Sequence, residues 1–160
     1  ERVKLVRALR RLKPKVILTH QSGDTHPDHD HIATLVRECS RLVAMRNYDG
    51  ETGDQKFAPP IVAHAVFSRR VVPTFIVDIS DFLEQRMESI KAHRSQFYDP
   101  NSTEPETMLT GKSYLEDIES RARYFGQLIG VKGGEPFFVH EALNVHDPIE
   151  LLTRPMNLYS

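Results

Sequence analysis

Residues 19–31 constrain this chain more than any other part of its sequence. They read Thr-His-Gln-Ser-Gly-Asp-Thr-His-Pro-Asp-His-Asp-His and hold four histidines and three aspartates. A short apolar run, residues 16–18, precedes them, and an amphipathic pattern follows them. Imidazoles and carboxylates at the exit of a buried strand are typical of a functional site in an α/β protein.

Four segments in which apolar residues recur with helical spacing predict helices. They are residues 3–12, stopped by Pro14; 27–45, capped by Thr25 or His26; 80–97, capped by Ser80 or Asp81; and 113–129. Short apolar runs predict strands at residues 15–20, 61–67, 74–79 and 135–139. We expect the first strand to be covered on both faces and the last to be a short edge strand. The segments 47–60 and 98–112 and the tail 147–160 are predicted to be irregular.

This order of elements predicts an α/β fold with a doubly wound, mostly parallel sheet flanked by helices, forming a single domain over residues 1–160. Three or four strands are few for such a sheet, and the chain opens on Glu1 already inside a helical pattern. We therefore expect the chain to be the C-terminal portion of a longer catalytic domain that contains further βα units.

Composition excludes several classes of function. The formal net charge is −1, so no overall positive field favours nucleic acid as a partner. No apolar run approaches the roughly 20 residues that a membrane span needs. The single cysteine, Cys39, excludes an internal disulfide and favours a reducing, cytoplasmic location.

Helical geometry separates the histidines of the first turn after Pro27. His29 precedes Ile32 by three residues and Val36 by seven, so its side chain is predicted on the buried face of the helix. His31 falls on the opposite, solvated face. Imidazole is a common zinc ligand, and we expect His29 to be the metal ligand of this segment.

The other polar residues of the segment suit acid–base chemistry. His26 precedes the helix, and Asp28 is two residues away and can orient it, as carboxylates orient many catalytic histidines. His20 and Asp24 line the same strand exit and are candidate substrate-binding residues. The alternative is a loop whose polar side chains only cap backbone groups. His64, within the run 61–67, is predicted to be a packing residue of a strand.

The segment Thr19-His20 to Asp24-Thr25-His26-Pro27-Asp28-His29 resembles the second signature of the LmbE/PIG-L family of zinc-dependent N-acetylglucosaminyl deacetylases. Residues 91–97 (Lys-Ala-His-Arg-Ser-Gln-Phe) are similar to a helix of the bacillithiol-pathway branch, and residues 121–137 are similar to its closing segment.

The resemblance implies a Rossmann-like fold and hydrolysis of the acetamide of an N-acetylglucosamine conjugate, a small-molecule amino-sugar substrate. It implies zinc bound by His29, an oxyanion-stabilising or proton-donating His26 supported by Asp28, and a substrate contact from His93. Histidine and carboxylate ligands also accept other divalent transition metals. We also expect that the protein can form a homo-oligomer.

The family's first signature, Ala-His-Pro-Asp-Asp-Glu, supplies two further zinc ligands and the general base, and this sequence contains no such segment. One histidine cannot hold catalytic zinc by itself, because affinity requires several preplaced ligands. A second hypothesis therefore stays open: the chain is a non-catalytic fragment or interaction domain of the same fold that does not hold metal alone.

Overall fold

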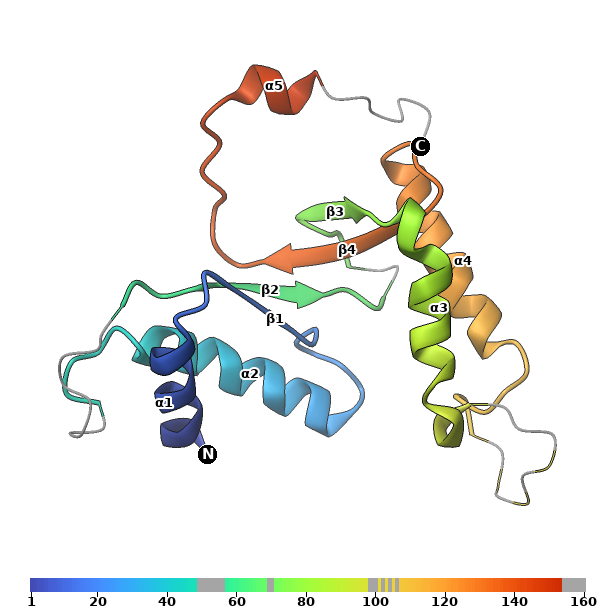
Figure 1. Ribbon diagram of the computed structural model, residues 1–160, viewed down its shortest axis with the longest axis horizontal. Helices are drawn as coiled ribbons and strands as arrows, with labels where there is room; N and C mark the ends of the chain where they lie inside the picture. The colour runs from blue at the N-terminus through green and yellow to red at the C-terminus, as the bar shows by residue number, and fades with distance from the viewer. Residues whose placement is uncertain are drawn as a thin grey trace. The chain divides into compact units, whose positions relative to one another are not determined.

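The computed structural model describes residues 1–48, 57–68, 71–97, 101, 103, 105 and 107–153. Its elements in chain order are α1 (Arg2–Leu12), β1 (Val16–Thr19), α2 (Pro27–Leu42), β2 (Ile61–Ala65), β3 (Phe75–Asp78), η1 (Ser80–Phe82), α3 (Leu83–Lys91), η2 (Arg94–Gln96), α4 (Tyr114–Leu128), β4 (Gly134–Val139) and α5 (Pro148–Leu152) (Figure 1). Much of the predicted loop 47–60 and part of the loop 98–112 lie outside the described residues. Over the described ranges, no helix combines the length and the apolar character needed to cross a membrane.

The four strands form one sheet in the order β1-β2-β4-β3. β1 pairs in parallel with β2, which sets Thr19 opposite His64. β2 pairs antiparallel with β4. The predicted α/β sheet flanked by helices is confirmed, but the sheet is mixed and not mostly parallel. β3 also runs antiparallel to β4, as the bonds from Thr74 N to the Phe137 carbonyl and from Ile79 N to the Gly133 carbonyl show (Figure 1). The prediction that residues 135–139 form an edge strand is wrong, because β4 lies between β2 and β3 and its neighbours are distant in sequence.

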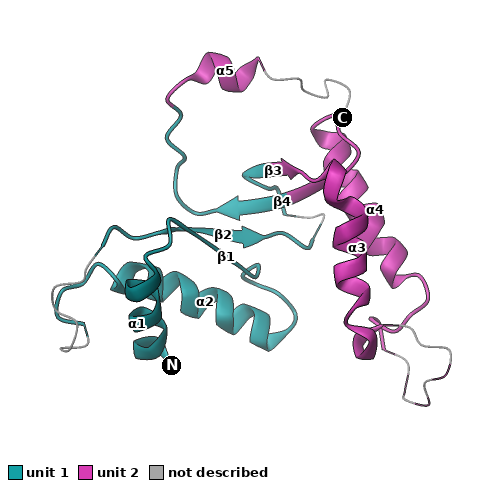
Figure 2. Ribbon diagram, in the orientation of Figure 1, with its two compact units in different colours: residues 1–75, 136–145 teal, residues 76–135, 146–160 magenta. Residues whose placement is uncertain are grey.

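The chain divides into two compact units (Figure 2). The first contains residues 1–75 and 136–145, and the second contains residues 76–135 and 146–160. β3 and β4 each contribute residues to both units. The assignment of residues 1–160 to a single domain stays a prediction.

In the first unit, α1 and α2 lie on the same side of β1 and β2 (Figure 1). Their apolar stripes meet in a core of Val6, Leu9, Cys39 and Val43, against which Ile17 of β1 packs. The opposite face of β1 carries Val16 and Leu18, which are 53% and 65% exposed. The prediction that this strand is covered on both faces is therefore wrong for the part of the chain that the structure describes.

A buried arginine completes this core. Arg10 of α1 is 2% exposed, and its guanidinium donates to the carbonyl oxygens of Val43, at 3.2 Å, and Met45, at 2.5 Å. These carbonyls follow the end of α2, where the last turn of a helix leaves acceptors without an intrahelical donor. Arg10 thus satisfies the C-terminal end of α2 from within the core.

In the second unit, the predicted helix 80–97 is three shorter elements: η1, α3 and η2. Ser80 does not cap α3, because its hydroxyl donates to Asp78 at 2.6 Å and accepts from the Lys132 amide at 3.1 Å. The predicted C-terminal helix is present as α4, and Gly130 follows it with φ 74°. The tail is not wholly irregular, since Asp147 caps the short helix α5 by accepting from the Glu150 amide at 2.9 Å.

Candidate functional site

The candidate site is the loop between β1 and α2. Gly23 adopts a left-handed conformation there, with φ 74°, which glycine tolerates better than other residues. The Gly23 amide donates to Asp30 Oδ1 at 2.6 Å. Because Asp30 lies in the first turn of α2, this bond ties the middle of the loop to the start of the helix.

Asp24 is the main acceptor inside the loop. Its Oδ1 accepts from the His26 backbone amide at 2.9 Å, and its Oδ2 lies 3.2 Å from Nδ1 of His29. The Asp24 side chain is 18% exposed and that of His29 is 39% exposed. Burial pushes the pKa of Asp24 up, but hydrogen bonds from the His26 amide and from His29 outweigh it, so that the pKa is lowered. Asp24 thus accepts from the backbone of one histidine and faces the ring of the other.

His26 is the N-cap of α2, as predicted. Its Nδ1 accepts a hydrogen bond from the Asp28 backbone amide at 3.2 Å. An imidazole that accepts at Nδ1 carries its proton on Nε2 when it is neutral. Asp28 contacts His26 through its backbone amide. The sequence prediction had assigned this contact to the Asp28 carboxylate.

Three imidazole rings stack at this strand exit. The His29 ring lies between the rings of His20, at a centroid distance of 4.1 Å, and His26, at 4.6 Å. Burial lowers the pKa of His20, and the neighbouring His29 lowers it further. His20 Nδ1 is buried without a hydrogen-bond partner among the described residues. The loop thus brings together the side chains of four predicted site residues, His20, Asp24, His26 and His29, whereas Asp28 takes part only through its backbone amide.

β2 supports this loop through a residue that was predicted only to pack. His64 is 1% exposed, and its Nδ1 lies 2.8 Å from the carbonyl oxygen of His20. The side chain of Gln21 accepts from the Phe67 amide at 3.2 Å, which is a second link between the loop and the end of β2. The sequence carried a usable signal, because parallel strands end at the same edge of a sheet and both runs place a histidine near that end.

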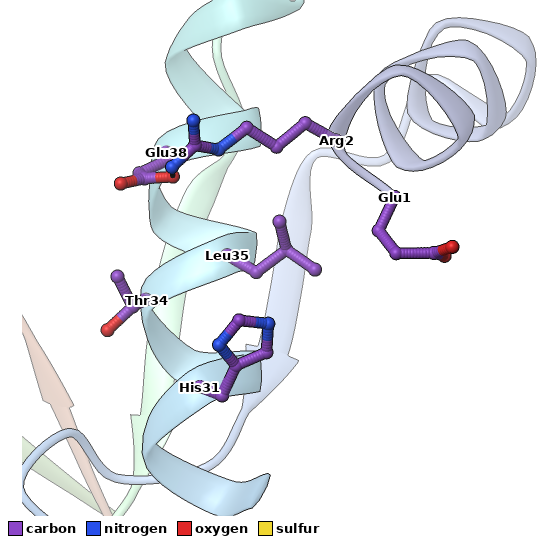
Figure 3. Close-up of a pocket in the computed structure, with 6 residues that line it drawn as sticks. All are labelled: Glu1, Arg2, His31, Thr34, Leu35 and Glu38. Atoms are coloured by element: carbon purple, nitrogen blue, oxygen red, sulfur yellow. Dashed lines mark ion pairs between the residues drawn. The ribbon is translucent and has the colours of Figure 1, made fainter.

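Two other histidines lie elsewhere. His93 belongs to the second unit, at the N-cap of η2, so its role as a substrate contact stays a prediction. His31 is exposed on α2, as predicted, and borders a surface pocket of about 340 Å³ that Figure 3 shows. The other residues that line this pocket are Glu1, Arg2, Thr34, Leu35 and Glu38.

The donor set for a metal ion is partial. Across the described ranges, no group of three or more His, Cys, Asp or Glu side chains is arranged to hold a metal. His29 itself has the form of one metal ligand: its Nδ1 faces a carboxylate, which leaves Nε2 available as a donor. The described residues of this loop could therefore supply one ligand, His29, to a metal ion, but they do not form a complete metal site.

Comparisons with known proteins relate this chain to deacetylases. No protein-family model matches it. The diacetylchitobiose deacetylase of Thermococcus kodakarensis is 26% identical over 138 residues, which are 84% of this chain and 48% of that protein. The chain thus spans about half the length of the curated relative that it matches.

Solved structures share the fold. The conserved protein TT1542 of Thermus thermophilus superposes with a TM-score of 0.72 and 30% identity, over 90% of this chain and 60% of that one. The N,N'-diacetylchitobiose deacetylase of Pyrococcus horikoshii gives a TM-score of 0.63 and 26% identity, over 86% and 50%. GalB, a 4-carboxy-2-hydroxymuconate hydratase of Pseudomonas putida KT2440, gives 0.68 at 15% identity over 91% and 60%, which shows the fold alone. The homology to diacetylchitobiose deacetylases supports the LmbE/PIG-L resemblance of the His-Pro-Asp-His segment.

Proposed function

We propose that this chain provides part of the active site of a metal-dependent hydrolase that removes the N-acetyl group from an N-acetylglucosamine conjugate. The observation that carries the proposal is the grouping of Asp24, His26 and His29 at the exit of β1, in a chain that is 26% identical to a diacetylchitobiose deacetylase. Both deacetylase relatives act, by their names, on an N-acetylated sugar.

We assign His29 to the metal, through Nε2, and regard zinc as the first candidate, with other divalent transition metals possible. Bound zinc would polarise the acetyl carbonyl and lower the pKa of a bound water to about 7. The remaining ligands and the general base would come from residues other than those of this loop. Asp24 orients His29 and does not reach substrate itself in this assignment.

His26 is proposed to stabilise the oxyanion that forms on the acetyl group. Because Nδ1 of His26 accepts from the Asp28 amide, its Nε2 is the protonated nitrogen of the neutral ring. That N–H can donate a hydrogen bond to the developing oxyanion. The departing sugar amine can take a proton from His26 only after the ring has taken up a second proton, because a neutral imidazole that lost its Nε2 proton would become an anion. The family resemblance assigns the Asp28 carboxylate to support His26. In the structure the backbone amide of Asp28 contacts the His26 ring.

The finer assignments rest on the sequence resemblance. Residues 91–97 resemble a helix of the bacillithiol-pathway branch and support the family more than a particular substrate. We propose His93 and His20 as contacts to the sugar.

A second candidate function follows from the incomplete donor set. A chain whose described residues offer no three-ligand group can act as a fold-completing or interaction module that holds no metal alone. The two candidates differ in one measurable property, which is metal content.

The test is elemental analysis together with acetate release from N-acetylglucosamine and diacetylchitobiose in the presence of Zn²⁺. It is run on this chain and on the product of a reading frame extended upstream. Stoichiometric metal and turnover in either protein support the deacetylase. A folded, extended protein with neither supports the non-catalytic module and rejects our proposal.

A further inference from the structure

The two oxygens of the Asp24 carboxylate have different partners. Oδ1 accepts from the His26 backbone amide at 2.9 Å, and from the Thr25 hydroxyl at 3.4 Å. Oδ2 faces His29 Nδ1 at 3.2 Å. A backbone amide can only donate, so the atom at the Oδ1 position must be an acceptor in any variant that keeps the loop.

We infer that Asp24 is a positioning residue that fixes His29 in the tautomer with its proton on Nδ1, which presents the Nε2 lone pair outward. Oδ1 already accepts from the His26 amide, and Oδ2 faces Nδ1 of His29 as a second acceptor oxygen, so the contact is formed by an Nδ1–H that donates to Oδ2. The inference rests on the proposed function only in naming Nε2 as the ligand atom. The tautomer itself follows from the hydrogen bond.

The assignment differs from both roles that the sequence suggested for the carboxylates of this loop. Asp24 was predicted to bind substrate, and Asp28 was predicted to orient a histidine. The Asp28 carboxylate has no hydrogen bond or ion pair within the described ranges, whereas Asp24 contacts the backbone of one histidine and the ring of the other. The carboxylate that orients His29 is therefore that of Asp24, in the loop before α2, and not that of Asp28, in the first turn of the helix.

Substitution of Asp24 by asparagine has a predictable orientation. The His26 amide requires the side-chain oxygen of Asn to take the Oδ1 position, so the NH₂ group must take the Oδ2 position and face His29. A donor there obliges Nδ1 to accept, which moves the ring proton to Nε2. An Asp-to-Asn change beside a serine-protease histidine leaves the geometry intact and traps the wrong tautomer in the same way. In Asp24→Asn the ligand nitrogen of His29 would be blocked by its own proton.

The experiment is ¹⁵N NMR of the histidine side chains in the full 160-residue chain, without metal, about two pH units above the ordinary histidine pKa of about 6.5. The signals of His29 are assigned by their loss in His29→Gln. We expect the wild-type ring to show the protonated shift at Nδ1 and the unprotonated shift at Nε2, and Asp24→Asn to exchange them. The matched control, Asp28→Asn, removes a carboxylate from the same segment and should leave the His29 pattern unchanged.

A wild-type His29 protonated on Nε2 overturns the inference, and this measurement needs no variant to fold. The same pattern in wild type and in a folded Asp24→Asn also overturns it, as does an exchange caused equally by Asp28→Asn. Acetate release and metal content of the upstream-extended protein are measured separately. The absence of both in a folded extended protein, together with the expected tautomers, rejects the proposed function and leaves the role of Asp24 intact.

Discussion

The ring of His64 and the carbonyl of His20 are joined by a hydrogen bond 2.8 Å long that connects β2 to the exit of β1. Nδ1 of His64 must donate, because a carbonyl only accepts. The other ring nitrogen, Nε2, is buried and has no partner among the described residues. Nδ1 of His64 therefore stabilises the loop through its hydrogen bond. The burial of Nε2 without a partner lowers the stability of the folded state.

Replacement of His64 by leucine should lower the free energy of unfolding by about 1–3 kcal/mol, because it leaves the His20 carbonyl without its buried donor. His64→Asn keeps an N–H donor near the Nδ1 position and should lose less. Urea denaturation of both variants measures the difference. Equal stability of the two would show that the hydrogen bond contributes little.

The close approach of two glycine-containing segments in the second unit predicts an asymmetric response to alanine. A Cβ on Gly126 would lie 2.7 Å from the backbone nitrogen of Gly133. A Cβ on Gly133 would meet only side chains, the nearest being that of Leu83, at 3.4 Å. Gly126→Ala should therefore destabilise the protein by about 1–3 kcal/mol despite the better helix propensity of alanine.

The matched control for this prediction is Gly133→Ala, which we expect to change stability by no more than about 0.5 kcal/mol. Thermal and urea unfolding of the two variants give the comparison. A neutral Gly126→Ala would mean that the two backbone segments separate easily, contrary to the contact described above.

The lowered pKa of His20 predicts how stability depends on pH. Burial lowers the pKa of this imidazole below its ordinary value of 6.5, so the unfolded chain binds its proton at a higher pH than the folded chain does. The stability contribution is complete above about pH 6.5 and decreases as the pH falls from there towards the folded pKa.

We therefore expect the free energy of unfolding of the wild type, relative to that of His20→Gln, to decrease as the pH is lowered from about 7.5 to about 5, on both sides of an ordinary histidine pKa. Denaturant titrations at several pH values measure it. Parallel pH profiles of the two proteins would contradict the prediction.

His26 and His29 should fail differently in a metal-loaded, catalytically active protein. His29→Ala should lose metal, because it removes a ligand. His26→Ala should keep metal and lose about 10²- to 10³-fold in kcat, the usual cost of removing one oxyanion donor. Elemental analysis and acetate release are measured on the same preparations. Equal loss of metal in both variants would contradict this division of roles.

Local sequence patterns predicted those features of the protein that depend on near neighbours in the chain. The apolar stripe of α1 and its end before Pro14, the start of α2 at Pro27, and the exposure of His31 follow from periodicity and from the missing N–H of proline. The grouping of polar residues at the exit of β1 was predicted for the same reason. The sequence left the cap of α2 open between Thr25 and His26, and the structure selects His26.

Which side chains meet in the site depends on the packing of segments that are distant in the sequence. The contact of Asp24 with His29 depends on a loop that Gly23 and Asp30 close, and the support from His64 depends on the pairing of β1 with β2. Two of the predictions that failed, a two-sided cover for β1 and an edge position for β4, concern neighbours far away in sequence. Local patterns fix the conformation of a segment, but strand order and side-chain partners depend on which distant surfaces pack together, and that is set by the folded chain as a whole.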